Sequence, residues 1–333
     1  MGWICGFDIR FGSWCRPDVE LAGEWRRHAL PTYIPVQEMD TPLAGLVRSA
    51  HTNQQVRMVI DVWDIETLPS DARGLLLASD VLLRNHRADE LEIEASRPKE
   101  RVFWQRRANA FADAKVALET DLAALIANDN IRSFHYSRMT DEEVQEMSHL
   151  GIIPTSKPFL RQRLNGLVAN GHLTATQADE VYAASPLNAG EAYGKRDGLF
   201  WTSAFPMPID DSGVARLLAI WGGEVASWTL DGDGAGLGLP SIGLPRIVEI
   251  AMPIATAMDG SAASTIAGRL VDLRMADLGL TKYRGGIDLY TTFAMQPEAV
   301  SVVHTEGEQA YADMGRGYPL SFTYWKSDED NAE

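Results

Sequence analysis

The chain has 333 residues, 45% hydrophobic and 23% charged, an ordinary globular composition with enough length for two domains. The formal net charge is −16; residues 1–130 hold 15 Lys and Arg against 20 Asp and Glu, and the rest holds 15 against 26. Neither part clusters the cations that non-specific nucleic-acid binding needs. Apolar runs fall short of the roughly 18–20 residues of a membrane helix, and the N-terminus lacks a basic, apolar signal sequence. We therefore expect a cytoplasmic protein with no membrane partner.

Residues 1–130 are expected to form a smaller α/β accessory domain that binds a partner or substrate. Cys5 and Cys15 are expected to be reduced and buried, because two cysteines cannot make a four-ligand zinc site. The turn residues Asn128, Asp129 and Asn130 predict the end of this domain. Apolar periodicity predicts strands at 3–11, 56–63 and 91–94, and helices at 74–83 and 104–127.

Residues 131–326 are expected to form a mixed α+β domain, followed by an acidic disordered tail at 327–333. Two capping boxes, Thr140 with Glu143 and Thr174 with Gln177, predict helix starts. Strands and helices do not alternate as in βαβ units, which favours α+β over a doubly wound sheet. The predicted strands are 133–138, 198–205, 224–230, 246–254, 287–293 and 299–303; further helices are predicted from Pro158 to Gly171, from Ser212 to Trp221 and at 259–278.

Several common motifs fail. The glycine-rich run 231–238 lacks the third small residue of a dinucleotide fingerprint, and Pro240 blocks the helix that should follow it. As a calcium loop it has Ala235 and Ile242 where oxygen ligands are required, so we expect this run to be a flexible turn between strands. The seven histidines show no zinc spacing, and the nucleophile-elbow and Walker motifs are absent from the sequence. We expect chemistry without a metal, or none.

One constellation remains. Phe134 to Arg138, a capped helix, and then Gly151-Ile152-Ile153-Pro154 are followed by an aromatic and hydroxyl segment, Phe200 to Ser203. This order resembles ADP-ribosyltransferase-fold proteins of the His-Tyr-Glu branch, over residues 131–305. The resemblance implies a split-sheet catalytic domain that uses NAD as a substrate, without a metal.

Breaking the nicotinamide–ribose bond passes through an oxocarbenium-like state, so the protein needs nearby negative charge and hydrogen bonds to ribose. With the resemblance, this chemistry implies that His135 binds the adenosine ribose and that aromatic and hydroxyl side chains line the nicotinamide pocket. Arg138 or Arg246 is expected to meet the pyrophosphate. The implied NAD-binding residues are His135, Tyr136, Ser137, Arg138, Trp201, Thr202, Ser203 and Arg246.

The catalytic acid, expected to work with His135, has three candidates. Glu224 ranks first, because it follows a helix stop and opens a predicted strand. Glu249 lies in the middle of a strand, where alternation points it away from the apolar face. Asp288 precedes a strand near the family's usual position for this acid, but it is one methylene shorter than glutamate.

The sequence therefore favours an enzyme that transfers ADP-ribose from NAD to a protein or nucleic-acid acceptor. The resemblance also implies a bacterial toxin of a toxin–antitoxin or phage-defence system, with a neutralising antitoxin protein as partner. The alternative is a catalytically inactive binding module of the same fold that docks a partner through exposed tryptophans. A third option is a metal-independent nuclease or hydrolase that uses His135 and a carboxylate as base and acid.

Overall fold

The computed structural model of the chain describes residues 58–96, 107–188, 196–227, 230–282 and 286–317. Every described residue belongs to one compact unit, Arg57–Glu333. The expected strand at 3–11, both cysteines and the tail at 327–333 lie outside the described residues.

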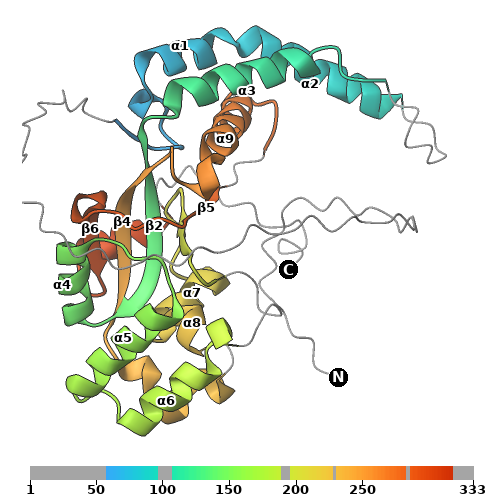
Figure 1. The fold of residues 1–333 in the computed structure, drawn as a ribbon. Helices are drawn as coiled ribbons and strands as arrows, with labels where there is room; N and C mark the ends of the chain where they lie inside the picture. Colours follow the sequence, from blue (N-terminus) through green and yellow to red (C-terminus); the bar gives the residue numbers. More distant parts are fainter. Residues whose placement is uncertain (1–57, 97–106, 189–195, 228–229, 283–285, 318–333) are drawn as a thin grey trace, which may run out of the picture. The chain divides into compact units, whose positions relative to one another are not determined.

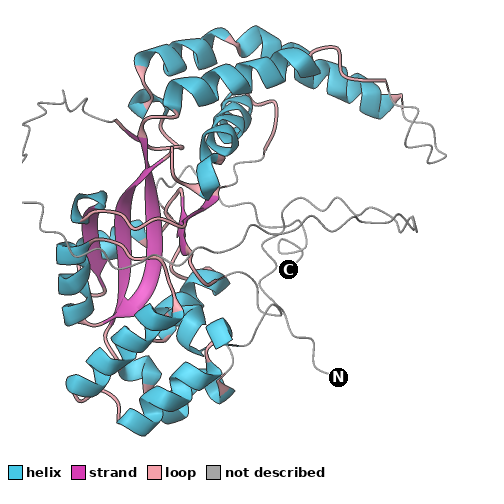
Figure 2. Ribbon diagram, viewed as in Figure 1, coloured by secondary structure: helices cyan, strands magenta, loops and turns pink. Residues whose placement is uncertain are grey.

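Six strands of the described residues form one open sheet (Figure 1, Figure 2). Five follow the order β5-β3-β2-β4-β6 with all neighbours antiparallel, and β1 pairs parallel with the start of β2. The central strand β2 pairs with β4 along all ten of its residues. The strands are β1 (Val59–Ile60), β2 (Asn130–Met139), β3 (Phe200–Ser203), β4 (Leu244–Pro253), β5 (Asp288–Thr291) and β6 (Val300–Thr305).

Ten α-helices lie in the same described residues, none long and apolar enough to cross a membrane. They are α1 (Ser70–Ala78), α2 (Asp80–Ala95), α3 (Ala112–Ile126), α4 (Asp141–Leu150), α5 (Lys157–Ala169), α6 (Ala175–Ala184), α7 (Ser212–Ala219), α8 (Gly223–Ser227), α9 (Ala262–Asp277) and α10 (Gln309–Met314). The short 3₁₀ helices are η1 (Ile65–Thr67), η3 (Pro186–Asn188), η5 (Asp231–Leu237), η6 (Leu239–Ser241), η7 (Met258–Gly260) and η8 (Pro297–Ala299). The expected mixed α+β class is confirmed.

The capping signals in the sequence mark real helix starts. Both predicted capping boxes form, the first at Thr140 before α4 and the second at Thr174 before α6. In each, the cap side chain accepts from the third residue's N–H, and that residue's side chain accepts from the cap N–H. Gly151 ends α4 with a φ of 78°, a conformation that glycine adopts without steric cost. Local chemistry therefore sets these boundaries.

Three local predictions are wrong. Residues 91–94, predicted as a strand, lie inside α2. Four alternating residues are too few to outweigh the helix-forming residues that precede them. The predicted strand opening at Glu224 is the short helix α8, since Gly222 and Gly223 turn the chain with φ of 73° and 53°. The glycine-rich run, predicted as a flexible turn between strands, contains η5.

The expected domain boundary at residue 130 does not separate two cores. The turn before Asn130 leads directly into β2, which pairs with β1. Leu76 of α1 and Leu122 of α3 belong to the same buried cluster as Ile250 of β4. A second buried cluster joins α5, α6 and α8 around Leu164 and the fully buried Trp221. The helices before β2 thus complete the core of the sheet, because their apolar sides are buried against it.

Glu143 connects α4 to the second cluster. Besides capping α4, its carboxylate accepts from Arg163 Nε at 2.8 Å and from Trp221 Nε1 at 2.9 Å. Burial alone would raise the pKa of Glu143, but Arg163 and the hydrogen bonds outweigh it and leave this pKa below its ordinary value. Arg163 also stacks over the Trp221 ring, 4.6 Å from the centroid. One carboxylate thereby joins three elements.

A row of alternating charges crosses one face of the sheet. Arg132 on β2 donates from Nε to Asp61 and from Nη1 to Glu249 on β4, both at 2.7 Å. The other oxygen of Glu249 lies 2.6 Å from His304 Nε2 on β6. Burial raises the pKa of Asp61 even though Arg132 opposes it. The row joins β2, β4 and β6 to the residue that follows β1 through mutually satisfied groups, of which Glu249 and His304 are buried.

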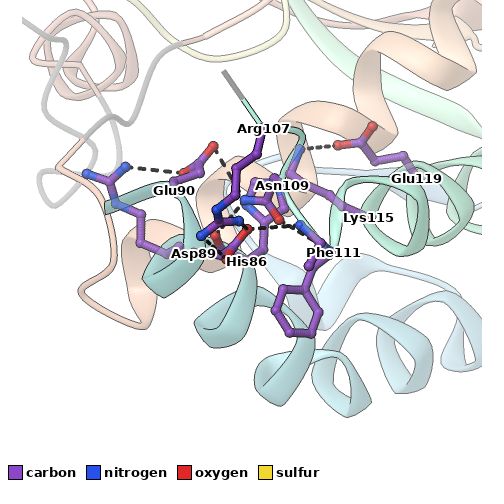
Figure 3. A network of polar contacts seen from close by, with 10 residues as sticks. His86, Asp89, Glu90, Arg107, Asn109, Phe111, Lys115 and Glu119 are labelled. Atoms are coloured by element: carbon purple, nitrogen blue, oxygen red, sulfur yellow. Dashed lines mark hydrogen bonds and ion pairs between the residues drawn. The ribbon is translucent and has the colours of Figure 1, made fainter. Parts of the chain in front are cut away.

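A polar network joins α2 to the start of α3 (Figure 3). Arg107 donates to Asp89 at 2.8 Å, and Asp89 also accepts from the backbone N–H of Ala110 at 2.9 Å. Asn109 donates to the carbonyl of His86 at 2.9 Å. These contacts fix where α3 begins relative to α2.

We expect Glu249→Leu to lower the free energy of unfolding by about 3 kcal/mol, because it removes the buried carboxylate that pairs with both Arg132 and His304. Urea denaturation of the full chain measures the change. Asp179→Ala is the matched control, since it breaks an exposed ion pair with Arg161 and should cost at most about 1 kcal/mol. Equal losses in the two variants would contradict a structural role for the row.

Candidate functional site

The predicted site residues lie on two faces of the sheet. Side chains alternate along β2, so His135 and Ser137 share one face, while Tyr136 and Arg138 share the other. Phe134 stands opposite Ser203 across the β2–β3 pair, which places Trp201 and Ser203 on the face of Tyr136. His135 and Trp201 therefore do not face each other, although the resemblance places them in one pocket.

Four side chains gather on the face of Trp201 where β3 pairs with β5, which lies at one end of the described sheet. Trp201 stands opposite Tyr290, with ring centroids 5.0 Å apart and planes tilted by 49°. Ser203 stands opposite Asp288. Together with Arg196, whose guanidinium carbon lies 5.5 Å from the centre of the Trp201 ring, they form what we call the edge site.

Arg196 links the edge site to Glu224. Its Nη2 lies 2.8 Å from Glu224 Oε2, and both side chains are only about a fifth to a quarter exposed, 20% and 24%. Glu224, the first-ranked acid of the sequence, is thus brought near Trp201 through an arginine that the sequence did not single out. The pair presents one cation and one carboxylate beside an aromatic ring.

Three buried polar atoms of the edge site have no hydrogen-bond partner among the described residues: Trp201 Nε1, Ser203 Oγ and Arg196 Nε. Burying an unpaired donor costs on the order of 1–3 kcal/mol, so such atoms are rare in folded proteins. Two donors and a hydroxyl without partners suit a polar ligand, which would supply the acceptors.

Asp288 is the exposed carboxylate of the edge site. Surrounding protein raises its pKa, Arg196 partly opposes this, and the negative charge of Asp211 adds to the rise. A carboxylate with a raised pKa, open to solvent and opposite a free hydroxyl, can accept a proton more readily than an ordinary aspartate.

His135 lies on the face of the sheet opposite the edge site. Its Nδ1 lies 2.9 Å from the carbonyl oxygen of Trp201, and its ring contacts Phe200 with centroids 4.5 Å apart. Burial lowers the pKa of His135 to about 4, so the ring is neutral near pH 7. A neutral ring with a carbonyl at Nδ1 must carry its proton there and donate it. His135 thereby ties β3 to β2.

The other two acid candidates differ in their surroundings. Glu249 is 4% exposed, and its two oxygens are taken by Arg132 and His304. It shares a face with Ser203, but Phe134 stands between them in the cross-strand row. Glu249 is therefore not brought to the edge site, whereas Asp288 is.

The remaining predicted binding residues are mostly occupied by structural contacts. Arg246 is buried and donates to Asp141, to Thr305 Oγ1 at 2.7 Å and to the Met139 carbonyl at 3.4 Å. Arg138 donates to the carbonyl of Ile242 at 3.0 Å.

Tyr136 is buried, and its hydroxyl oxygen accepts from the N–H of Met207 at 2.5 Å. Ser137 and Thr202 are buried on the face of His135, and Thr202 Oγ1 has no partner in the described part of the chain. Ser137 and Thr202 therefore lie on the face opposite the edge site, while Tyr136 shares the face of the edge site with its hydroxyl engaged by Met207.

Two edge-site residues, Arg196 and Tyr290, were not identified from the sequence. Arg196 precedes β3 in a polar stretch without periodicity, so no pattern marked it. Tyr290 alternates with Leu289 in a strand that was predicted, and its pairing with Trp201 follows only from the β3–β5 register. Among the described residues, no group of three or more His, Cys, Asp or Glu could hold a metal ion.

We expect stability to fall as the pH drops from about 6.5 to about 4, because the unfolded chain protonates His135 at its ordinary pKa while the folded chain resists until about 4. The loss attributable to His135 is at most about 3 kcal/mol. His135→Asn keeps an N–H for the Trp201 carbonyl and cannot titrate. The free energy of unfolding of this variant should therefore depend less on pH between about 6.5 and about 4. Urea unfolding across the pH range measures it.

His172→Asn, at an exposed position, is the control and should keep the wild-type profile. An unchanged profile in His135→Asn would show that His135 does not resist protonation.

Comparisons of the chain with protein-family models, with curated proteins and with solved structures found no match. The resemblance to ADP-ribosyltransferases stays a prediction. The edge site itself consists of an aromatic pair, an unpaired hydroxyl, an arginine and an exposed carboxylate.

Proposed function

We propose that the chain cleaves NAD at the edge site and transfers ADP-ribose to an acceptor. One observation carries the proposal: Ser203 and Asp288 stand opposite each other beside the Trp201–Tyr290 pair, with Arg196 over Trp201. The aromatic pair offers a surface for the nicotinamide ring, and the arginine and free donors offer partners for phosphate and ribose oxygens.

The reaction needs few groups. The bond between nicotinamide and ribose C1′ breaks, and its electron pair leaves with nicotinamide. The acceptor atom bonds to C1′ and gives up its proton. Asp288 takes that proton, and its negative charge stabilises the positive charge that develops on the ribose. Its raised pKa suits it to this exchange better than the fully paired Glu249.

Glu224 has a different role in this proposal. It is held by Arg196 at 2.8 Å, so it positions the arginine over Trp201. Asp288 thereby replaces Glu224 as the preferred acid, because it stands directly opposite Ser203. NAD fits the donor set, since its oxygens can accept from the three unpaired atoms of the site.

The competing function is a binding module that holds a nucleotide-like ligand without cleaving it. The same unpaired donors favour it, because they call for acceptors whether or not a bond breaks. Nicotinamide release distinguishes the two: binding of NAD without release, by a folded full chain, would establish the module.

We expect Asp288→Asn to lower the rate of nicotinamide release by at least about 100-fold, because it removes the proton acceptor with almost no change of shape. Chromatography of free nicotinamide, with labelled NAD and a cell extract in parallel, measures release and transfer. Asp179→Asn is the control: this exposed carboxylate of α6 is paired with Arg161, and the variant should keep the wild-type rate.

An active Asp288→Asn would refute Asp288 as the acid, and Glu224→Gln would be tested next. A folded wild-type chain that releases no nicotinamide and transfers no label would refute the enzyme.

A further inference from the structure

The turn that precedes α9 adopts an uncommon backbone conformation. Met258, Asp259 and Gly260 of η7 follow one another with φ of 51°, 53° and 86°. Met258 and Asp259 are the two non-glycine residues with positive φ in the described part of the chain. Side-chain-bearing residues enter this left-handed region at a steric cost, which persists where surrounding contacts demand the geometry. The contacts of Asp259 show what this turn positions.

The carboxylate of Asp259 is directed at β5. Its Oδ2 accepts from the hydroxyl of Tyr290 at 3.1 Å, and its Oδ1 accepts from Thr292 Oγ1 at 3.3 Å. Ala257, just before the turn, forms an antiparallel bridge with Thr291. The turn therefore runs beside the end strand of the described sheet and contacts three consecutive residues, 290–292.

Tyr290 connects this turn to the edge site. Its ring packs against Trp201, and across that pair lie Arg196 and the Ser203–Asp288 pair. Burial, and then Asp259, raise the pKa of Tyr290, so its hydroxyl stays protonated and available as a donor. Since β5 has a neighbour on only one side in the described sheet, the hydroxyl contact restrains the outer end of the ring.

We infer that Asp259 is a positioning residue of the edge site: it holds the Tyr290 ring against Trp201 and so sets the aromatic surface on which a flat ligand ring packs. The inference rests on the proposed function for the identity of that ligand, and on the structure alone for the hold on Tyr290. Asp259 itself touches neither ligand nor reacting atoms.

Two substitutions separate positioning from a purely structural role. Asp259→Gly removes the carboxylate and suits the left-handed backbone, so a purely structural turn would tolerate or even favour it. Asp259→Asn tolerates the same backbone and keeps one amide oxygen as an acceptor for Tyr290. Positioning therefore predicts that glycine disturbs Tyr290 and that asparagine preserves it.

The first test needs no NAD. The full chain is labelled with 3-fluorotyrosine, and the Tyr290 resonance in the ¹⁹F NMR spectrum is assigned by its loss in Tyr290→Phe. We expect Asp259→Gly to move this resonance toward its position in Trp201→Leu, which lacks the indole ring, and Asp259→Asn to leave it in place. A Tyr290 resonance unmoved in Asp259→Gly would overturn the inference, whether or not the chain cleaves NAD.

The second test uses the proposed reaction. Asp259→Gly should raise the KM for NAD roughly threefold to tenfold, the range expected for a weakened aromatic contact, while kcat changes little. Tyr290→Phe should do the same, and the double variant should add little more, because both changes remove the same Tyr290–Asp259 hydrogen bond. A fall in kcat with unchanged KM would contradict positioning of the ring, and absence of any cleavage would refute the proposed function but leave the NMR result valid.

Discussion

The arrangement of the sheet depends on how unequally the central strand β2 is paired. On one side β2 pairs with β4 over ten residues. On the other side its pairing with β3 places Phe134 opposite Ser203. The hydrogen bond between His135 and the Trp201 carbonyl adds a contact where the strand pairing is short. Within the sheet β5 is joined to β2 only by way of β3, so this connection helps to place both strands, together with the turn before α9 that contacts β5.

This dependence gives His135 a part that the resemblance does not imply. On the opposite face from Trp201, its ring does not stand beside Asp288, and its Nδ1 proton is engaged by a carbonyl. A protonated imidazole would gain little there, since burial opposes the charge. The neutral ring instead acts through the backbone: it holds the strand whose next side chains, Trp201 and Ser203, form the edge site.

The sequence predicts well what local chemistry decides. Capping boxes, the glycine after α4 and the apolar runs of β2 and β4 are short-range signals, and the structure confirms them. The site was harder, because the partners of Trp201 are fixed by the β3–β5 register, which joins residues about 90 positions apart. Alternation correctly marked Glu249 as turned to one face, but could not show that Arg132 and His304 satisfy it.

The difference between Glu249 and Asp288 shows how surroundings decide the use of a carboxylate. They share one face of the sheet, on β4 and β5, with β2 and β3 between them. Arg132 and His304 occupy both oxygens of Glu249, so breaking these contacts costs the fold stability. Asp288 has no such hydrogen-bonded partners: the residue reaches solvent, surrounding protein raises the pKa of its carboxyl group, and Arg196 acts on it only at a distance. A group that can change its protonation without cost to the core is better suited to chemistry, which is why we propose the site at the edge of the sheet and not at its centre.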